Sequence, residues 1–283
     1  MSENRDNTPP QLAPPVIKAE LNPKELKDLF YAKSLLENPG FTARIANIIG
    51  TPIEKGFKLL PKNWSAVVQN ASKTALTKAL QIAVATLGTR KRASSSEGFH
   101  KLLVGASGGI GGAFGLAALP IELPLSTTIM LRSIADIARS EGHSLSTVQT
   151  RLSCLEVFAL GGRTQRDDAT ESSYWAVRAA LASAISEAAT YMTQRSVLEK
   201  TAPAVVRLIT AISSRFGVVV SEQVAAKAVP IVGAAGGTII NVLFMDHFQD
   251  MARGHFIVKR LEAKYGIDLI RSTYESLAIP LEP

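Results

Sequence analysis

The 283-residue chain is poor in cysteine, tryptophan and charged side chains, and the charged residues make up only 19% of it. Because Cys154 is the single cysteine, no disulfide can form within the chain, which favours a reducing compartment. Cys154 lies in the apolar run CLEVFAL, which indicates a buried thiol and not a reactive one. Residues 1–18 lack the apolar core of a secretory signal, so we expect the protein to stay on the cytoplasmic side.

The sequence also lacks the alternation of strand and helix patterns that a parallel sheet requires. Its one run of three β-branched residues, 218–220, is flanked by helix formers. We therefore predict an all-α fold, a multi-helix domain with two glycine-rich apolar helical hairpins at its centre. Residues 1–22 are polar and proline-rich and are predicted to form a disordered arm, with residues 23–283 forming a single helical domain.

Capping signals and breaks give the expected helix limits. Asn22, Pro23 and Glu25 predict a capped helix start, and Gly50-Thr51-Pro52 predicts a break between two short helices. Gly88–Gly98 reads as a linker. The longer helices are predicted at 23–37, 63–87, 125–140, 146–160, 171–194, 197–213, 218–228, 244–264 and 269–277.

Two runs, Leu102–Ile121 and Ala228–Met245, carry no charged side chain and approach the roughly 20 residues that span a bilayer as a helix. They repeat one pattern, VGASGG and VGAAGG, in which glycines four apart would give a helix a smooth face for close packing. We expect the runs to pack on each other or on apolar neighbours, and Gly109→Leu to disrupt folding or membrane association. The packing glycines are Gly105, Gly108, Gly109, Gly111, Gly112, Gly115, Gly233, Gly236 and Gly237.

The hexapeptide VGASGG also fits G-x-S-x-G, the nucleophile elbow of serine hydrolases. That elbow needs a strand before the serine, and no strand pattern precedes Ser107. The second copy of the pattern has Ala235 in the serine position. Phosphate-binding glycine motifs are absent from the sequence. The pattern therefore favours helix packing over a nucleophile.

Glu122 lies between two prolines at the end of the first uncharged run. Burial of an unpaired carboxylate is costly, so we expect Glu122 to pair with Arg132, which shares a helix face with Asp136. An ion pair that joins helices is the favoured role, and a functional site is the alternative.

A second polar cluster follows the second uncharged run and consists of Asn241, Asp246, His247, Asp250 and His255. These residue types can ligate a divalent metal or carry out acid–base chemistry, but their spacing is not diagnostic of either. Helix caps and interhelical hydrogen bonds are the favoured roles. The alternative is a soluble helical enzyme, such as a hydrolase, or a metal-binding protein that uses this cluster.

The formal net charge of +7 favours acidic partners. Arg90, Lys91 and Arg92 lie just before the first uncharged run, where they could hold an anionic membrane surface. Nucleic acid is not expected as a partner, because basic and aromatic residues are not interleaved and no nucleic-acid-binding module is recognisable.

Several blocks of the sequence resemble the bacterial EcsC family, from about Pro39 to Tyr274. These blocks are Pro39-Gly40, LPIELP with Glu122, LRSIADIA, CLEVFALG, FGVVVSEQVAAKAVPIVGAAGG, Asn241 and HFQDMARGHF with the following RLE. The family takes its name from a protein encoded beside the subunits of an ABC transporter. The resemblance implies a cytoplasmic or membrane-associated helical protein, and it supplies no catalytic residues.

Together these patterns predict a non-enzymatic protein that serves a membrane complex as an accessory or scaffold. The expected partners are membrane lipid or a membrane protein complex, with no cofactor and with the oligomeric state left open. The expected location is the cytoplasmic face of the inner membrane, either peripheral or partly inserted.

Overall fold

The computed structural model describes residues 21–37, 41–50, 52–87, 115–162, 173–194, 201–229 and 233–278. Across these ranges the chain is helical and forms no strand, which confirms the all-α prediction. The elements are α1 (Pro23–Glu37), α2 (Phe41–Ile49), α3 (Glu54–Leu59), α4 (Trp64–Thr86), the 3-10 helix η1 (Gly115–Ala118), α6 (Leu119–Ser140), α7 (Val148–Leu160), α8 (Ser173–Gln194), α9 (Pro203–Ala228), α10 (Gly233–Tyr265) and α11 (Ile267–Ser276).

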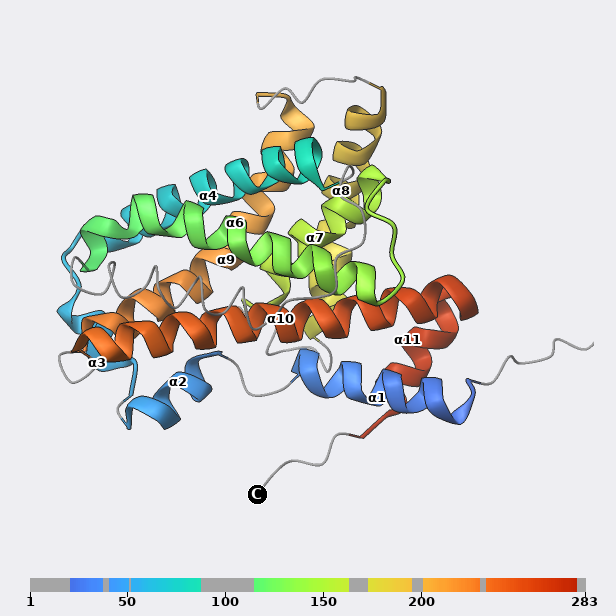
Figure 1. The fold of residues 1–283 in the computed structure, drawn as a ribbon, viewed down its shortest axis with the longest axis horizontal. Helices are drawn as coiled ribbons and strands as arrows, with labels where there is room; N and C mark the ends of the chain where they lie inside the picture. The colour runs from blue at the N-terminus through green and yellow to red at the C-terminus, as the bar shows by residue number, and fades with distance from the viewer. Residues whose placement is uncertain are drawn as a thin grey trace, which may run out of the picture.

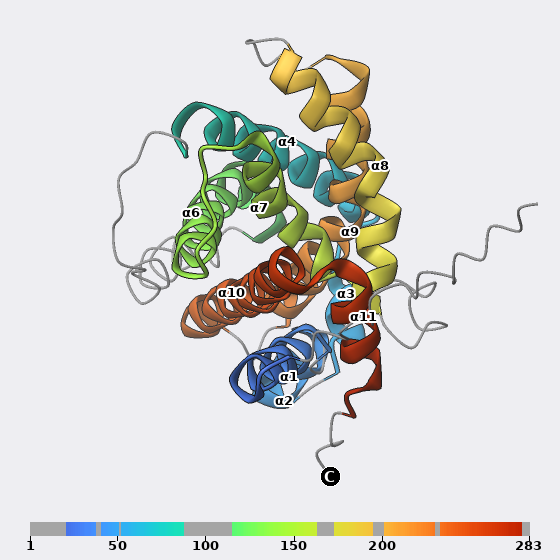
Figure 2. The same ribbon diagram turned by 90° about the vertical axis from the view of Figure 1, so that its right-hand side faces the viewer.

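The longest element, α10, runs along almost the whole molecule (Figure 1). Helices α6 and α4 lie on one side of it, and α1 and α2 lie on the other. The view along the long axis shows α10 between these two groups, with α8 and α11 on an outer side (Figure 2). The first turns of α6 and α10, the last turn of α9 and the short α3 all lie at one end, on the left of Figure 1.

Local sequence signals begin and end several helices as expected. The Asn22 side chain accepts a hydrogen bond from the Glu25 backbone N–H at 2.9 Å and so caps α1, whose first residue is Pro23. Helix α6 ends in a Schellman motif, in which Gly142 adopts φ +88° and the next residue bonds back to Ala138. Positive φ favours glycine at that turn.

The core contains five phenylalanines that join α2, α7, α9 and α10. Ring centroids within the cluster lie 5.1 to 6.1 Å apart, mostly in edge or tilted contacts. The rings belong to Phe41, Phe158, Phe216, Phe244 and Phe248. Cys154, one helical turn before Phe158 in α7, is fully buried. Burial raises the pKa of its thiol to about 12, which confirms an unreactive core position.

The predicted break at 213–218 is wrong, because α9 runs through it without interruption. The hydroxyls of Ser213 and Ser214 donate hydrogen bonds to carbonyl oxygens of the preceding turn, so these polar side chains are satisfied within the helix. Phe216 is fully buried, and Gly217 lies close to Gln69 of α4. Tertiary burial therefore outweighs the weak local helix propensity.

Helices α6 and α10 both begin earlier than predicted. Helix α6 starts at Leu119 and accommodates Pro120 in its first turn, where the missing N–H would have no helical partner. It then passes through Pro124. Helix α10 starts at Gly233 and continues past Gly254, so the second uncharged run is largely helical.

Two of the close helix contacts are made by glycines that do not belong to the runs of glycines four apart. At Gly254 an added Cβ would lie 2.6 Å from Leu36 Cγ, so this glycine lets α1 approach α10. At Gly56 an added Cβ would lie 1.9 Å from the Ala225 carbonyl oxygen, so α3 lies directly on α9. Among the predicted packing glycines, those from Gly105 to Gly112 lie outside the described residues, Gly115 opens η1, and Gly233, Gly236 and Gly237 lie in the first turns of α10.

Candidate functional site

Glu122 and Asn241, two of the predicted site residues, meet at the end of the molecule where α6, α9 and α10 converge. Glu122 Oε1 accepts a hydrogen bond from Lys227 Nζ at 2.8 Å and another from Asn241 Nδ2 at 3.0 Å. Gln223 Nε2 donates to Asn241 Oδ1 at 2.8 Å. We call Glu122, Gln223, Lys227 and Asn241 the Glu122 cluster.

The helix positions suit the charges of this cluster. Glu122 lies in the first turn of α6 and Lys227 in the last turn of α9, where the helix dipoles favour an anion and a cation respectively. Their side chains are 10% and 11% exposed. Two charges so little exposed are stabilised by pairing with each other, and each would be costly alone. The Glu122 cluster therefore holds three helix ends together.

The expected pairing of Glu122 with Arg132 is wrong. Ten residues of helix separate the two by about 15 Å, and Arg132 points to solvent. Asp136 instead pairs with Arg139 at 2.7 Å, and Arg139 also donates to the Leu87 carbonyl at the end of α4. This pair links α6 to α4 and leaves Arg132 outside the cluster.

The remaining predicted residues lie along α10 and contact different parts of the fold. His247 Nε2 lies 3.1 Å from the Gly161 carbonyl oxygen, at the end of α7. Asp250 pairs with Arg44 of α2 at 2.9 Å, and Asp246 is half-buried. These contacts join α10 to α2 and α7, which is the interhelical role that the sequence favoured for them.

His255 belongs to a chain of polar contacts in the interior between α7, α8 and α10. Arg178 binds Glu262 through two hydrogen bonds of 2.6 and 2.9 Å and donates to the Tyr174 hydroxyl at 3.3 Å. The Tyr174 hydroxyl lies 3.1 Å from His255 Nδ1, and His255 Nε2 lies 3.4 Å from Glu156 Oε2. We call these five residues the His255 chain.

Burial determines the protonation of the His255 chain. His255 is fully buried, and desolvation lowers its pKa to about 4, so the imidazole is neutral near pH 7. Burial alone would raise the pKa of Glu156, but His255 and the more distant Lys259 and Arg178 hold that pKa below its usual value. Each group donates to the next along the chain if the Tyr174 hydroxyl hydrogen points at His255 Nδ1 and the His255 Nε2 hydrogen points at Glu156. Such a chain can hold a proton in place.

The sequence patterns did not identify four members of the His255 chain, namely Glu156, Tyr174, Arg178 and Glu262. One signal was present for Glu156, because it is the charged residue within the otherwise apolar run CLEVFAL. A charge in such a run requires a buried partner. The partner could not be identified, because the contacts of His255 reach α7 and α8 across long stretches of chain.

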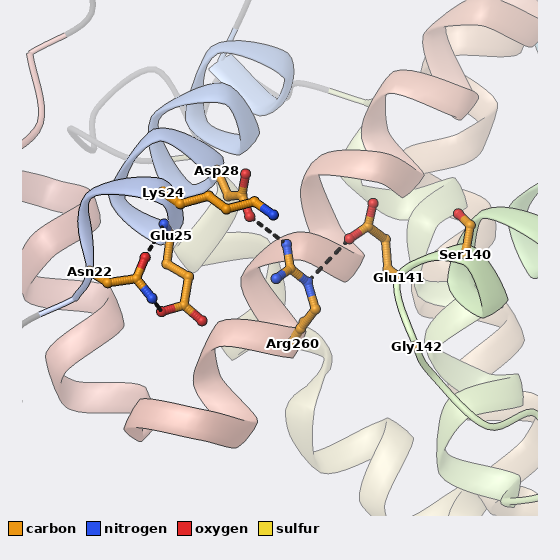
Figure 3. A pocket seen from close by; sticks show the side chains of 8 residues that line it. All are labelled: Asn22, Lys24, Glu25, Asp28, Ser140, Glu141, Gly142 and Arg260. Atoms are coloured by element: carbon orange, nitrogen blue, oxygen red, sulfur yellow. Dashed lines mark hydrogen bonds and ion pairs between the residues drawn. The ribbon is translucent and has the colours of Figure 1, made fainter.

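Among the residues that the structure describes, no group of three or more His, Cys, Asp and Glu side chains is arranged to hold a metal ion. An open cleft of about 490 Å³ lies between the start of α1, the end of α6 and the last third of α10. Three of its charged side chains are engaged with one another, as Figure 3 shows: Arg260 bridges Asp28 at 2.9 Å and Glu141 at 3.2 Å. Glu25 pairs with Lys264 at 2.7 Å.

The fold and these clusters define a helical domain in which the polar side chains of the interior join helices to one another. The chain belongs to the EcsC protein family, whose family model matches residues 31–261. The resemblance noted in the sequence blocks is thereby confirmed. No curated protein and no solved structure matches the chain.

Proposed function

We propose that the protein is a non-enzymatic, membrane-associated helical protein that serves a membrane complex as an accessory or scaffold at the cytoplasmic face. The observation that carries the proposal is the position of the two uncharged runs. The last residues of the first run lie in α6, most of the second run lies in α10, and these two helices begin at the same end of the molecule (Figure 1).

Exposed apolar side chains at that end support the proposal. Ile121 is 81% exposed, Leu125 is 52% exposed and Ile239 is 47% exposed. Ile121 and Leu125 are one helical turn apart on α6, so they form one outward stripe. Water-exposed isoleucine and leucine beside two uncharged runs are typical of a surface that meets lipid or an apolar partner.

Helix α9 does not support the proposal. It is the one described helix long and apolar enough to cross a membrane, but half of its most apolar window is buried in the protein. It contacts α3, α4, α7 and α8, as a core helix does. A buried core helix satisfies the same criteria of length and hydropathy.

The alternative, an enzyme or metal-binding protein that uses Asp246, His247, Asp250 and His255, has less support. The side chains of His247, Asp250 and His255 make contacts with α7, α2 and α8 at separate places along α10. Chemistry at a common substrate or metal would require them to converge.

Membrane fractionation of the untagged protein from its own cells tests the proposal. Retention in the pellet through alkaline carbonate would support inserted apolar segments, and release by high salt would support peripheral binding through basic residues. Recovery entirely in the soluble fraction would contradict the proposal and would direct attention to metal analysis and activity screens of the α10 cluster.

A further inference from the structure

We infer that one end of the molecule is a docking face for an anionic lipid bilayer. Resting on the proposed function, this inference adds the contacting residues and the lipid class. The residues are Lys55, Lys58, Lys62, Ile121, Leu125 and Ile239, and we call them the end face. They come from α3, the α3–α4 turn and the first turns of α6 and α10.

Contacts at the last turns of α9 hold these separate segments together. Gly56 of α3 lies against the Ala225 carbonyl, and two residues further on Lys227 binds Glu122 of α6. Glu122 in turn accepts a hydrogen bond from Asn241 of α10. The elements that carry the end face are therefore fixed to one another at the left end of the molecule in Figure 1.

The end face combines the two properties that a peripheral membrane contact needs. Lys55, Lys58 and Lys62 are exposed within one short stretch, where Glu54 is the one exposed carboxylate among residues 52–64. Ile121, in the first turn of α6 at the same end of the molecule, is the most exposed large apolar side chain in the described chain. Basic side chains attract anionic headgroups, and apolar tips enter the boundary of the acyl region.

A second exposed apolar stripe lies on α1, but its surroundings differ. Leu26 and Phe30 are each 38% exposed, less than half the value for Ile121. They lie one helical turn apart in a helix that follows a polar arm, whereas the end face includes Ile121 of the first uncharged run and Ile239 of the second. The lysines and the uncharged runs therefore favour the end face over the α1 stripe.

The test measures how much of the purified full chain sediments with vesicles of phosphatidylcholine, alone or mixed with phosphatidylglycerol. Wild type should bind the mixed vesicles and show little binding to phosphatidylcholine. The triple variant K55Q/K58Q/K62Q should lower the partition coefficient by roughly 100-fold, because each lysine contributes a factor of about five. The double variant I121S/L125S should lower it by about tenfold.

Matched controls change the same residue types elsewhere. K24Q/K27Q/K78Q removes equal charge from α1 and the middle of α4, and L26S/F30S removes the α1 stripe. Both should leave vesicle binding within about twofold of wild type, because electrostatic attraction falls off within a Debye length of the membrane. A melting curve for each variant excludes loss of folding as the cause.

Equal binding to both vesicle types, or binding lost in the controls and kept in the end-face variants, would overturn the inference. Absence of vesicle binding by a protein that fractionates with membranes in cells would also overturn it, since a protein partner would then hold the chain there. That outcome would leave the proposed function standing. A chain that is soluble in cells and does not bind vesicles would overturn both.

Discussion

At the scale of single residues, Glu122 shows how a charge is kept inside a largely apolar region. It lies between two prolines at the start of α6 and accepts hydrogen bonds from both Lys227 and Asn241. Glu122, directly after the first uncharged run, and Asn241, within the second, were singled out in the sequence as polar residues in apolar surroundings. Their contact with each other, 119 residues apart, required the fold.

Replacement of Lys227 by methionine should destabilise the protein by about 2 kcal/mol, because the Glu122 carboxylate would remain buried without its cation. The double variant E122Q/K227M should recover part of that loss, since no charge is then buried. Urea unfolding of the two single variants and the double variant gives the coupling energy. If the effects of the two single variants simply add, the coupling energy is zero and the interaction between Glu122 and Lys227 contributes nothing to stability.

His255 makes stability depend on pH. Burial lowers its pKa from 6.5 to about 4, so the unfolded chain binds a proton at a higher pH than the folded protein does. Stability should therefore fall as the pH drops through this window, by about 2 kcal/mol between about pH 7.5 and about pH 5. The lowered pKa of Glu156 adds a further loss below about pH 4.5 in the same direction.

Unfolding in urea at a series of pH values measures this dependence. His255→Gln should flatten the curve over the window, whatever its effect on stability at neutral pH. His143→Gln serves as the comparison, because His143 is half-buried and its pKa is also lowered by burial. An unchanged slope in His255→Gln would show that other groups cause the acid sensitivity.

At the scale of helices, local signals were enough wherever a cap or break marks the end. The limits of α1, α4, α7, α8 and α11 agree with the predicted ranges within two residues. Asn22 and Pro23 at the start of α1 are an example, because the cap acts within one turn. Such ends depend on neighbouring residues and need no knowledge of the fold.

The ends that were missed depend on distant contacts. The Ser213–Gly217 stretch has weak helix propensity, yet the burial of Phe216 against α7 and α10 keeps α9 continuous. In the same way, the pairing of Lys227 with Glu122 spans 105 residues of sequence. A single sequence contains no local signal for contacts of this kind, so the cluster partners stayed unidentified.

Gly56→Ala should destabilise the protein by about 2 kcal/mol, because the new Cβ would collide with the Ala225 backbone and push α3 away from α9. Lys58→Ala on the exposed side of the same helix is the control and should change stability by less than about 0.5 kcal/mol. Thermal and urea unfolding measure both. Equal stability of the two variants would show that α3 packs on α9 less closely than the structure indicates.

At the scale of the whole molecule, α1 is the outermost layer on one side of α10, and it carries its own cap at Asn22. Removal of residues 1–20 should therefore leave the melting temperature unchanged. Removal of residues 1–37 should lower it strongly, because Leu29, Ala32 and Leu36 would no longer cover α10. Melting followed by circular dichroism compares both truncations with the full chain, and a large effect of the shorter deletion would contradict the prediction.

The length of α10 has a mechanical consequence. Asn241, near the proposed lipid contact, and Arg260, in the cleft at the opposite end, are separated by about 28 Å along one unbroken helix. A rod of that length acts as a lever arm: a tilt of about 5° at one end displaces the other by about 2.5 Å. That displacement is comparable to the length of the two hydrogen bonds by which Arg260 bridges α1 and α6. A fluorescent label beside Arg260 would therefore detect a tilt of α10 that is caused by binding at its first turns.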